Sequence, residues 1–522
     1  MRRAVFFLPL IAGLAAGFAH PPWGFLPGLL GYGLMFTRVD RAATFRSASL
    51  RGWLAGCGYF LVSLWWIYEP FQVDAQAQGW MAPFAVAIMA GGMALFWGAA
   101  AGVYHTLKGM SVWRLLLFVG LLAAAEWLRG HVLTGFPWNL PGETWRAGSA
   151  PSQAAALVGA YGLTWITLAV ASAPWLAREG RPGKIAAATA VAGIALLFVF
   201  GAVRLGETPS PRQGAPMVRI VQANVDQKIK YDRRVFADIV RRYLTLTARP
   251  AARRPDVVIW PEGAIPAAID DYLAPRTWTQ DAIAQAMTPG QTLILGGYRY
   301  GGAHNGKEAI FNSFAVVRPS SAGLTVVGVY DKYRLVPFGE FMPLDSLAAR
   351  LGIKQMVHVG DGFTPGPPPR PLRVAGLPVM QPLICYEGLF PGFTRAGARA
   401  AGARPDWIVN ISNDAWFGAG SGPLQHLNIA GYRAIEEGLP MVRATPTGVS
   451  AMIDAFGRIV PGKMLGEGAF GVIDASLPPA LPPTLYDRWG DWPFAAMLFV
   501  SLAGTRRPLR HGARKRAAPP PP

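Results

Sequence analysis

The first 205 residues contain seven apolar runs, and this pattern constrains the fold more than any other feature of the chain. A bilayer core of ~30 Å requires roughly 20 apolar residues per spanning helix. The two leading runs are short and meet at Pro21-Pro22, which predicts a tight hairpin. A weaker eighth candidate covers residues 489–504, with Trp489 and Trp492 as interface anchors. We therefore expect seven transmembrane helices in a membrane domain 1–205, over residues 4–20, 22–37, 52–68, 82–106, 113–128, 152–177 and 185–203, and an eighth within 486–504.

Basic residues are distributed unevenly between the loops that join these runs. By the positive-inside rule, cytoplasmic loops carry an excess of Lys and Arg. The predicted loops on one side, with the two chain ends, hold Arg2, Arg3, Arg38, Arg41, Arg46, Arg51, Lys108, Arg114, Arg178, Arg181, Lys184, Arg506, Arg507, Arg510, Arg514, Lys515 and Arg516. The opposite short loops hold only Arg129 and Arg146. We therefore predict a cytoplasmic N-terminus, a cytoplasmic basic Pro-rich tail 505–522, and an extracytoplasmic region 206–485.

The composition excludes several other classes of protein. Hydrophobic residues make up 52% of the chain, which excludes disorder as its main state. Two cysteines cannot build a disulfide scaffold. Charged residues make up only 15%, against ~25% in soluble domains. The net charge of +19 would suggest a nucleic-acid partner in a soluble chain. Because many of these charges follow the predicted cytoplasmic ends, we expect no nucleic-acid partner.

Two features of the membrane half have more than one interpretation. Residues 1–22 have the pattern of a signal peptide, although the apolar run that follows favours a retained hairpin. Glu126 stands near the outer end of the fifth run. An acid within a membrane span is a functional candidate by default. The alternative is that Glu126 simply reaches the membrane interface.

From about residue 206 to 485, short β-rich runs alternate with helical stretches. Strands are predicted over residues 218–224, 256–260, 292–297, 314–317, 324–330, 379–385, 407–412 and 449–453. Helices are predicted over residues 233–247, 278–287 and 422–437. This alternation indicates a layered α/β domain.

Three chemically capable side chains each follow a predicted strand. Glu262 comes directly after one strand, Lys332 follows another, and Cys385 follows a third. Functional residues favour such strand ends in α/β sheets. Taken singly, Glu262 and Lys332 are more often solvated charges, and a lone cysteine such as Cys385 is more often a small buried hydrophobe. Together they define a candidate cysteine nucleophile with a base and a cation.

The motifs around these residues make the resemblance specific. Pro261-Glu262, then Lys332 within D-K-Y-R-L-V-P-F-G-E, then Cys385 within I-C-Y-E, resemble the Glu-Lys-Cys triad of the nitrilase superfamily. With the preceding apolar runs and the motif N-I-S-N-D-A-W-F-G at 410–418, the chain resembles the bacterial apolipoprotein N-acyltransferases. It departs from the family at Pro446, where Asn is usual, and near Tyr231, where Trp is frequent.

This resemblance implies a fold and a set of roles. The fold is a multi-pass α-helical membrane domain joined to an α/β nitrilase-like domain, a layered α-β-β-α sandwich. Cys385 would form a thioester with an acyl chain, Glu262 would transfer protons, and Lys332 would stabilise the oxyanion with the backbone N–H of Tyr386. Glu340 and Glu387 would hold Lys332 or Glu262. Trp138, Trp416 and Phe417 would line an acyl path.

The resemblance also implies partners and a location. The acyl donor would be a membrane phospholipid and the acceptor the diacylglyceryl-modified N-terminus of an apolipoprotein, in the last step of lipoprotein maturation. The enzyme would lie in the bacterial inner membrane as a monomer, with its catalytic domain in the periplasm. The sequence carries no Gly-rich phosphate loop and no metal-ligand cluster, so we expect no cofactor and no metal.

Two alternatives remain open at this point. A membrane-tethered amidase or nitrilase that hydrolyses small amides would use the same three residues. A transporter or scaffold with a vestigial triad is a different class, and the scarcity of ionisable residues within the predicted spans argues against a transporter. An amide-linked acyl product distinguishes acyl transfer from amide hydrolysis.

Overall fold

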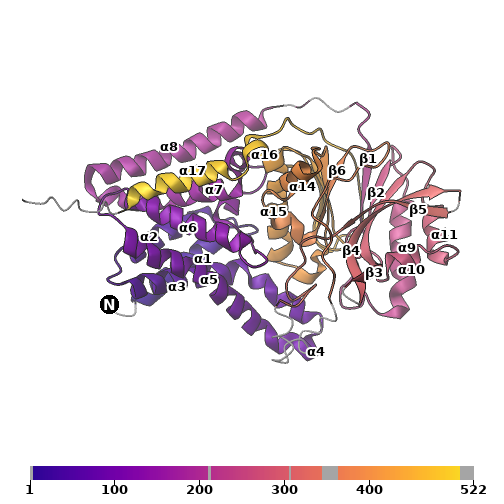
Figure 1. Cartoon of the computed structure of the whole chain (residues 1–522), viewed down its shortest axis with the longest axis horizontal. Helices are drawn as coiled ribbons and strands as arrows, with labels where there is room; N and C mark the ends of the chain where they lie inside the picture. Colours follow the sequence, from indigo (N-terminus) through magenta and orange to yellow (C-terminus); the bar gives the residue numbers. More distant parts are fainter. Residues whose placement is uncertain are drawn as a thin grey trace, which may run out of the picture.

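The computed structural model describes residues 4–207, 209, 213–304, 307–321, 323–343 and 362–505. A bundle of helices from the N-terminal half lies beside a two-sheet domain from the C-terminal half (Figure 1). The predicted charges at Arg2, Arg3 and from Arg506 onward lie outside the described residues.

The helical half follows the apolar runs of the sequence. Its helices are α1 (Ala4–Phe18), α2 (Leu30–Asp40), α3 (Phe45–Ser63), the short α4 (Ala75–Gln78), α5 (Ala82–Leu107), α6 (Arg114–His131), α7 (Ala155–Ser172) and α8 (Gly180–Leu205). After the sheet domain the chain returns to the bundle through α16 (Leu485–Trp489) and α17 (Trp492–Ser501), and α17 packs against α6 and α7.

Two predicted runs differ from the observed helices. The run 22–37 was expected to be helical throughout, but α2 begins only at Leu30. Gly24 has φ +61°, outside the right-handed helical region, and Pro22 and Pro27 remove backbone donors near it. The helix predicted over 52–68 is observed as α3, which begins at Phe45 and ends at Ser63. It begins at Phe45 because the Thr44 hydroxyl caps it by accepting a hydrogen bond from the Ser47 N–H.

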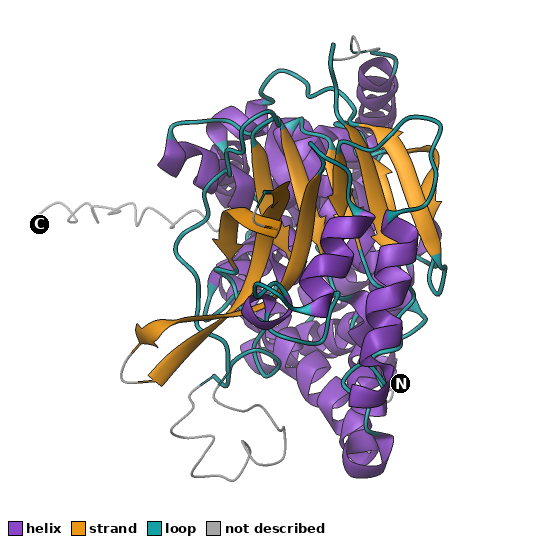
Figure 2. Ribbon diagram, turned by 90° about the vertical axis from the view of Figure 1, so that its right-hand side faces the viewer, coloured by secondary structure: helices purple, strands orange, loops and turns teal. Residues whose placement is uncertain are grey.

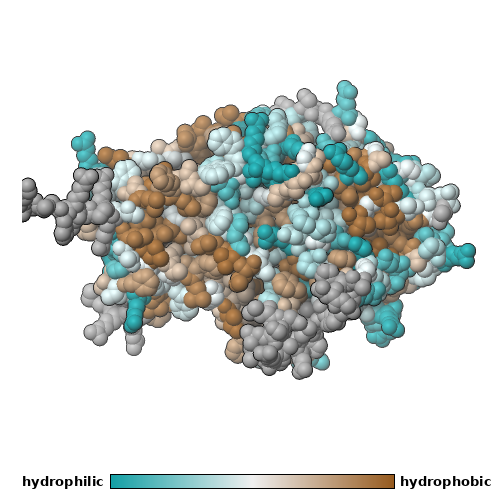
Figure 3. Space-filling model, in the orientation of Figure 1, coloured by the Kyte–Doolittle hydropathy of each residue, from teal (hydrophilic) through white to brown (hydrophobic). Residues whose placement is uncertain are grey.

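Among the described residues, three helical stretches are long and apolar enough to cross a membrane: Ala75–Leu107, Pro151–Arg178 and Gly180–Leu205. Shorter apolar helices cover Phe7–Gly17 and Trp492–Gly504. Figure 3 shows hydrophobic side chains gathered over the helical half. Ile88 of α5 and Leu196 of α8 are more than two-thirds exposed, as expected of helix faces that contact lipid rather than water.

Glu126 is buried within the bundle. Its carboxylate accepts a hydrogen bond from the Trp97 indole at 2.7 Å and pairs with Arg129 one turn along α6. Arg129 also donates to the carbonyls of Phe136 and Trp138. The assignment of Arg129 to an outer loop was therefore wrong, and both residues act as a buried anchor for the loop that follows α6.

In the described part of the C-terminal half, the strands form two sheets. The first has the order β11-β1-β2-β3-β4-β5 and the second β10-β9-β8-β7-β6. The strands are β1 (Met217–Gln222), β2 (Val257–Ile259), β3 (Thr292–His304), β4 (Lys307–Ser320), β5 (Gly323–Asp331), β6 (Met380–Ile384), β7 (Trp407–Ile411), β8 (Met441–Ala444), β9 (Ser450–Ile453), β10 (Ile459–Leu465) and β11 (Gly471–Ser476). The parallel strands β1, β2 and β3 lie in the middle of the first sheet, and the parallel strands β8, β7 and β6 form one side of the second sheet, with β6 at its edge.

The two sheets pack face to face and are covered by helices on both outer faces (Figure 2). Ile220, Ile259 and Val316 of the first sheet share one core with Val409 and Val442 of the second. On the side turned away from the helical bundle, α9 (Phe236–Thr247) and α11 (Trp278–Ala286) cover the first sheet. On the side that faces the bundle, α14 (Phe393–Ala401) and α15 (Ser421–Glu437) cover the second sheet. The expected α-β-β-α sandwich is therefore confirmed.

Helix α15 lies between the second sheet and the helical bundle. Its Ile429 and Ile435 share a hydrophobic core with bundle residues such as Leu163 and with Ile408 of β7. Asn428 of α15 donates to the Glu143 carbonyl at 2.8 Å, in the loop between α6 and α7. This continuous core fixes the sheet domain against the bundle and against the loop between α6 and α7.

Candidate active site

Glu262 and Lys332 meet at the ends of two strands of the first sheet. Glu262 lies three residues after β2, and Lys332 directly follows β5. Lys332 Nζ lies 3.3 Å from Glu262 Oε1, and both side chains are buried. Nearby carboxylates raise the pKa of Lys332 well above its usual value, against the effect of burial, so its ammonium stays charged.

Two asparagines hold the Glu262 carboxylate. Asn312 of β4 donates its Nδ2 to Glu262 Oε1 at 2.7 Å, and the Asn413 backbone N–H donates to Oε2 at 2.8 Å. Both oxygens are thus engaged, and the carboxylate is fixed between the two sheets. The strand β3 runs so close behind it that a Cβ on Gly296 would lie 2.6 Å from the Glu262 Cα, which explains a glycine at this position.

Glu340 is the second carboxylate on Lys332. Its Oε1 lies 2.8 Å from Lys332 Nζ and accepts another bond from Asn312 at 2.7 Å. Its Oε2 accepts from the Val336 N–H at 2.7 Å. The Lys332 ammonium therefore lies between two carboxylates that share Asn312.

Cys385 faces this pair from the second sheet, at the turn that follows β6. Its backbone has φ +47°, in the left-handed region that non-glycine residues rarely adopt. Burial, followed by the nearby Glu262 carboxylate, raises the pKa of the thiol to about 12, and Lys332 opposes the shift. The thiol is therefore protonated at neutral pH, and a base must remove its proton before it can attack an ester.

Glu387 has a different place from the one expected. Its Oε1 accepts bonds from the Tyr330 hydroxyl at 2.7 Å and the Tyr333 N–H at 2.8 Å, and its Oε2 accepts from the Ile384 N–H at 2.8 Å. In the sequence, Tyr330 and Tyr333 stand on either side of Lys332, and Ile384 directly precedes Cys385. Instead of bonding to Lys332 or Glu262, Glu387 joins the two strand ends that carry the lysine and the cysteine.

Tyr386 connects the cysteine turn to the helical half. Its hydroxyl donates to the Gly135 carbonyl at 2.5 Å, in the loop after α6. In the same loop, Arg334 of the sheet domain donates to the Thr134 carbonyl at 3.1 Å. The loop after α6 therefore contacts both segments of the sheet domain that carry the site, one after Cys385 and one after Lys332.

The aromatic candidates fall into two groups. Trp138 is buried, packs against Trp66 and Phe417 with ring centroids 4.4 and 5.6 Å apart, and donates to Gln425. Trp416 is 40% exposed. Trp138 and Phe417 thus form part of a closed wall between bundle and sheet domain, whereas Trp416 faces outward.

The sequence gives no role to several polar residues near the site, although two of them, Ser412 and Asp414, lie within the motif at 410–418. Asp414 is buried and accepts bonds from Ser412, His426 and Arg443 at 2.7, 3.0 and 2.6 Å. Ser412 also bonds to Cys385. These contacts join the segment that follows β7 to β8 and α15, so only the folded chain reveals them.

Lys230 is a further buried cation beside the site. It is 2% exposed, and a Cβ on Gly263 would lie 2.9 Å from its ammonium. Burial lowers the pKa of Lys230 to about 8, while the charge of Glu262 opposes this shift. Lys230 stands in an irregular loop after β1, where no periodicity identifies a buried position.

Within the described residues, no group of three or more His, Cys, Asp or Glu side chains is arranged to hold a metal.

Two family models match most of the chain. Residues 12–173 match the apolipoprotein N-acyltransferase N-terminal domain, and residues 217–481 match the carbon-nitrogen hydrolase. Among solved structures, the chain is similar to an amidase from Nesterenkonia sp. AN1, at 17% identity and a TM-score of 0.36 over 52% of this chain and 94% of that one. The fold and the site define an enzyme of the carbon-nitrogen hydrolase class whose catalytic domain is joined to a helical membrane domain.

Curated relatives narrow this class. An apolipoprotein N-acyltransferase from Caulobacter vibrioides is 55% identical over 95% of this chain and 93% of its own length. Relatives with the same name from Bradyrhizobium diazoefficiens and Rhodopseudomonas palustris are 37% and 35% identical, over 95% and 96% of this chain and 94% of each relative. The chain belongs to the apolipoprotein N-acyltransferase family. It is a membrane protein and an acyltransferase that acts on lipid and lipoprotein substrates, which excludes the transporter and scaffold alternatives and disfavours small-amide hydrolysis.

Proposed function

We propose that the enzyme moves an acyl chain from a glycerophospholipid to the α-amino group of a diacylglyceryl-modified N-terminal cysteine, through a thioester on Cys385. The observation that carries this mechanism is the buried group of Glu262, Lys332 and Cys385 at the meeting point of the two sheets. It supplies a nucleophile, a proton acceptor and a fixed cation, which acyl transfer through a covalent intermediate requires.

In the first half-reaction, the Cys385 Sγ attacks the ester carbonyl carbon of the phospholipid. Glu262 takes the thiol proton as the C–S bond forms, because the thiol is protonated at neutral pH. The ammonium of Lys332 and the Tyr386 backbone N–H stabilise the oxyanion of the tetrahedral intermediate. The intermediate collapses by breaking its C–O bond, and the leaving lysophospholipid oxygen receives the proton from Glu262.

In the second half-reaction, the α-amine of the acceptor attacks the thioester carbonyl. Glu262 takes a proton from the attacking nitrogen, and the C–S bond breaks as the amide forms. The Cys385 thiolate then receives that proton, which restores the resting enzyme. Water must stay away between the two steps, since it would hydrolyse the thioester. We propose that buried Trp138 and half-buried Phe417, whose rings pack against each other, provide this protection.

For the membrane arrangement, we infer a membrane domain 1–205 with seven spans, a catalytic domain 206–485, an eighth span within 486–504 and a cytoplasmic tail 505–522. The uneven distribution of basic residues supports cytoplasmic ends and a periplasmic catalytic domain. We further propose that the enzyme works in the inner membrane as a monomer. Cysteine labelling of Arg146 and Arg181 variants from the periplasmic side tests this orientation. Only Arg146→Cys is expected to react, and the opposite pattern contradicts the topology.

The decisive experiment traps the acyl-enzyme. Purified enzyme mixed with phospholipid carrying a labelled acyl chain is expected to retain label that hydroxylamine releases. The matched pair of variants is Cys385→Ala and Cys57→Ala, because these are the two cysteines of the chain. Cys385→Ala is expected to lose the label and Cys57→Ala to keep it. A wild-type enzyme without label, or equal labelling of both variants, contradicts the thioester mechanism.

The acceptor reaction separates acyl transfer from small-amide hydrolysis. Adding a diacylglyceryl peptide to the labelled enzyme is expected to move the label into an amide-linked product that resists hydroxylamine. Release of ammonia from small amides, without any acylated peptide, would contradict acyl transfer.

A further inference from the structure

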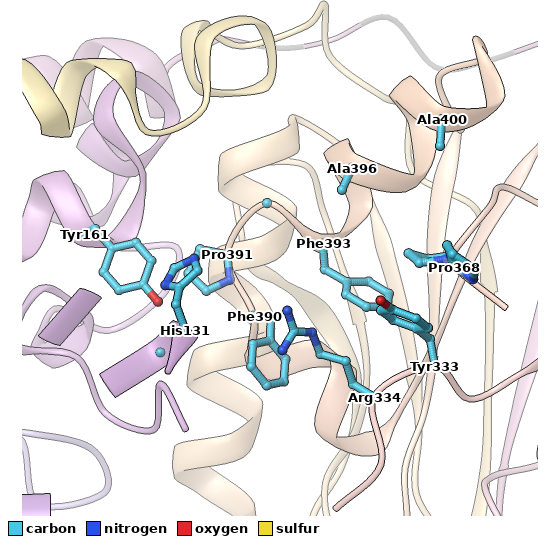
Figure 4. A pocket seen from close by; sticks show the side chains of 13 residues that line it. His131, Tyr161, Tyr333, Arg334, Pro368, Phe390, Pro391, Phe393, Ala396 and Ala400 are labelled. Atoms are coloured by element: carbon cyan, nitrogen blue, oxygen red, sulfur yellow. The ribbon is translucent and has the colours of Figure 1, made fainter. Parts of the chain in front are cut away.

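A cavity of about 380 Å³ lies between the helical bundle and the catalytic domain (Figure 4). On the bundle side it is lined by His131 at the end of α6 and by Tyr161 of α7. On the catalytic side it is lined by Tyr333 and Arg334, which follow Lys332, and by the segment from Phe390 into α14. The catalytic steps described above do not use these side chains.

Two polar groups at this cavity lack the partners that buried groups usually have. The Tyr161 side chain is 1% exposed, and its hydroxyl has no hydrogen-bond partner in the part of the chain that the structure describes. In Figure 4 this hydroxyl points toward His131 and the cavity. The Arg334 Nε is likewise buried without a partner among the described residues. A ligand that accepts hydrogen bonds would satisfy both groups.

Arg334 brings a positive charge to the same wall. Its guanidinium lies 4.1 Å from the centre of the Phe390 ring, and its Nη1 donates to the Thr134 carbonyl at 3.1 Å. Neither contact is with an anion, so neither neutralises the charge. A planar guanidinium that is held by an aromatic ring and keeps free donors is well suited to a phosphate.

The remaining walls are apolar. Tyr333 and Phe393 lie with ring centroids 6.5 Å apart, and prolines at 368, 369 and 391 complete the lining. A site that combines the Arg334 guanidinium, the hydroxyls of Tyr161 and Tyr333 and aromatic walls fits an amphiphile that carries an anionic group, rather than a free ion.

The cavity also lies next to the reacting groups and at the expected level of the membrane surface. Phe390 packs against Tyr386 with ring centroids 5.1 Å apart, and Tyr386 follows Cys385. On the other side, Phe494 of α17 packs against Tyr161 at 5.9 Å. The neighbouring Trp489 and Trp492 are exposed, as is typical of side chains at a membrane interface.

We propose that this cavity binds the phosphate and glycerol of the acyl donor, with phosphate oxygens accepting hydrogen bonds from Arg334 and Tyr161. This inference rests on the proposed function. The volume is at the lower end of small-molecule sites, ~300–1,000 Å³, so the headgroup and glycerol fit and the two acyl chains must leave the cavity. The lysophospholipid product keeps the same phosphate and therefore binds in the same place.

The first test measures how the rate of Cys385 acylation depends on the mole fraction of phosphatidylethanolamine in detergent micelles. Arg334→Gln is expected to raise the half-saturating mole fraction at least about tenfold, the loss typical of a charged hydrogen bond, with the maximal rate within about twofold of wild type. Arg241→Gln removes the same charge from exposed α9 and is the matched control, with unchanged kinetics expected.

A donor without phosphate separates the cavity from the reacting residues. A p-nitrophenyl acyl ester is expected to acylate Arg334→Gln and wild type equally. If phospholipid fails to acylate the wild type, the proposed function is wrong. If it acylates the wild type and Arg334→Gln with the same half-saturating mole fraction, the cavity proposal is wrong and the function stands.

The third test uses Tyr161→Phe, which removes only an unpartnered hydroxyl and therefore leaves folding intact. It is expected to raise the half-saturating mole fraction several-fold, and this variant decides the question if Arg334→Gln also loses activity toward the p-nitrophenyl ester. Glycerol 3-phosphate is expected to compete with phospholipid in the wild type more strongly than inorganic phosphate, and to lose this effect in Tyr161→Phe. Unchanged kinetics and competition in Tyr161→Phe would overturn the proposal, as would equal competition by inorganic phosphate.

Discussion

The ammonium of Lys332 lies 2.8 Å from the carboxylate of Glu340, and this contact keeps the lysine in place without occupying the proposed base. Lys332 lies farther from Glu262, at 3.3 Å. Because Glu340 carries the closer contact and is itself bonded to the Val336 N–H, the lysine remains fixed while Glu262 exchanges protons. We therefore propose that Glu340 acts by positioning Lys332.

Replacing Glu340 with Gln tests this division of roles. The variant removes one negative charge, so Lys332 is expected to pair more closely with Glu262 and to hinder its proton transfer. We expect the acylation rate of Cys385 to fall by roughly 10²-fold, comparable to the loss of an oxyanion donor. Stopped-time labelling with phospholipid measures this rate. Asp238→Asn, on exposed α9, is the control with the same charge change, and a wild-type rate in Glu340→Gln contradicts the positioning role.

The sequence alone predicts much of the sheet domain for a physical reason. Strands such as β2 and β7 are short, continuous apolar runs that are buried on both faces, and this pattern is visible without any neighbour. The motifs at Glu262 and Cys385 follow such buried strands, whereas Lys332 follows the half-exposed edge strand β5. At all three positions, strand prediction and family resemblance point to the same residues.

Other parts depend on contacts between distant segments. The strand β8 was not predicted, because Met441–Ala444 is short and becomes a strand only by pairing with β7 and β9. Glu387 was assigned to Lys332 or Glu262, but its bonds reach Tyr330 and the backbone at Tyr333, more than 50 residues away. Neither periodicity nor residue type encodes such a partner.

Glu387 also gives a prediction about pH and stability. Burial raises the pKa of Glu387 to about 7, from an ordinary value of 4.5. Between these values the folded state holds a proton that the unfolded state releases, so the contribution of Glu387 to stability is lost as pH rises from about 4.5 to 7. Glu387→Gln cannot titrate, and its Tm is expected to depend less on pH over this range than that of the wild type.

The same variant is expected to be less stable at every pH. A Gln amide nitrogen cannot accept the bond from the Ile384 N–H, and leaving a buried donor unpaired costs about 1–3 kcal/mol. Thermal unfolding in detergent at pH 4.5, 5.5, 6.5 and 7.5 measures both effects. An equally steep pH dependence in wild type and Glu387→Gln would show that another group is responsible.

Lys230 is expected to control the pH dependence of acylation. Two cations, Lys332 and Lys230, lie beside Glu262. A second carboxylate, Glu340, is connected to Glu262 by Asn312, which donates to both. In Lys230→Met a positive charge beside Glu262 is lost, so the acylation rate should fall more steeply toward acid pH than in the wild type. Lys230→Arg keeps the charge and should keep the wild-type profile. Identical profiles for all three proteins would exclude an electrostatic role for Lys230.

Trp138 is expected to protect the thioester from water. Its ring packs against both Trp66 and Phe417, and its indole N–H donates to Gln425 at 2.9 Å. Trp138→Ala removes a fully buried side chain, which typically costs about 3–5 kcal/mol of stability, and opens the wall for water. We expect the acyl-enzyme to release more free fatty acid and less acylated peptide, whereas Trp138→Phe keeps most of the packing and most of the transfer. The ratio of fatty acid to peptide product, measured after phospholipid labelling at a temperature where each variant is folded, checks this expectation. An unchanged ratio in Trp138→Ala would mean that this wall does not exclude water from the intermediate.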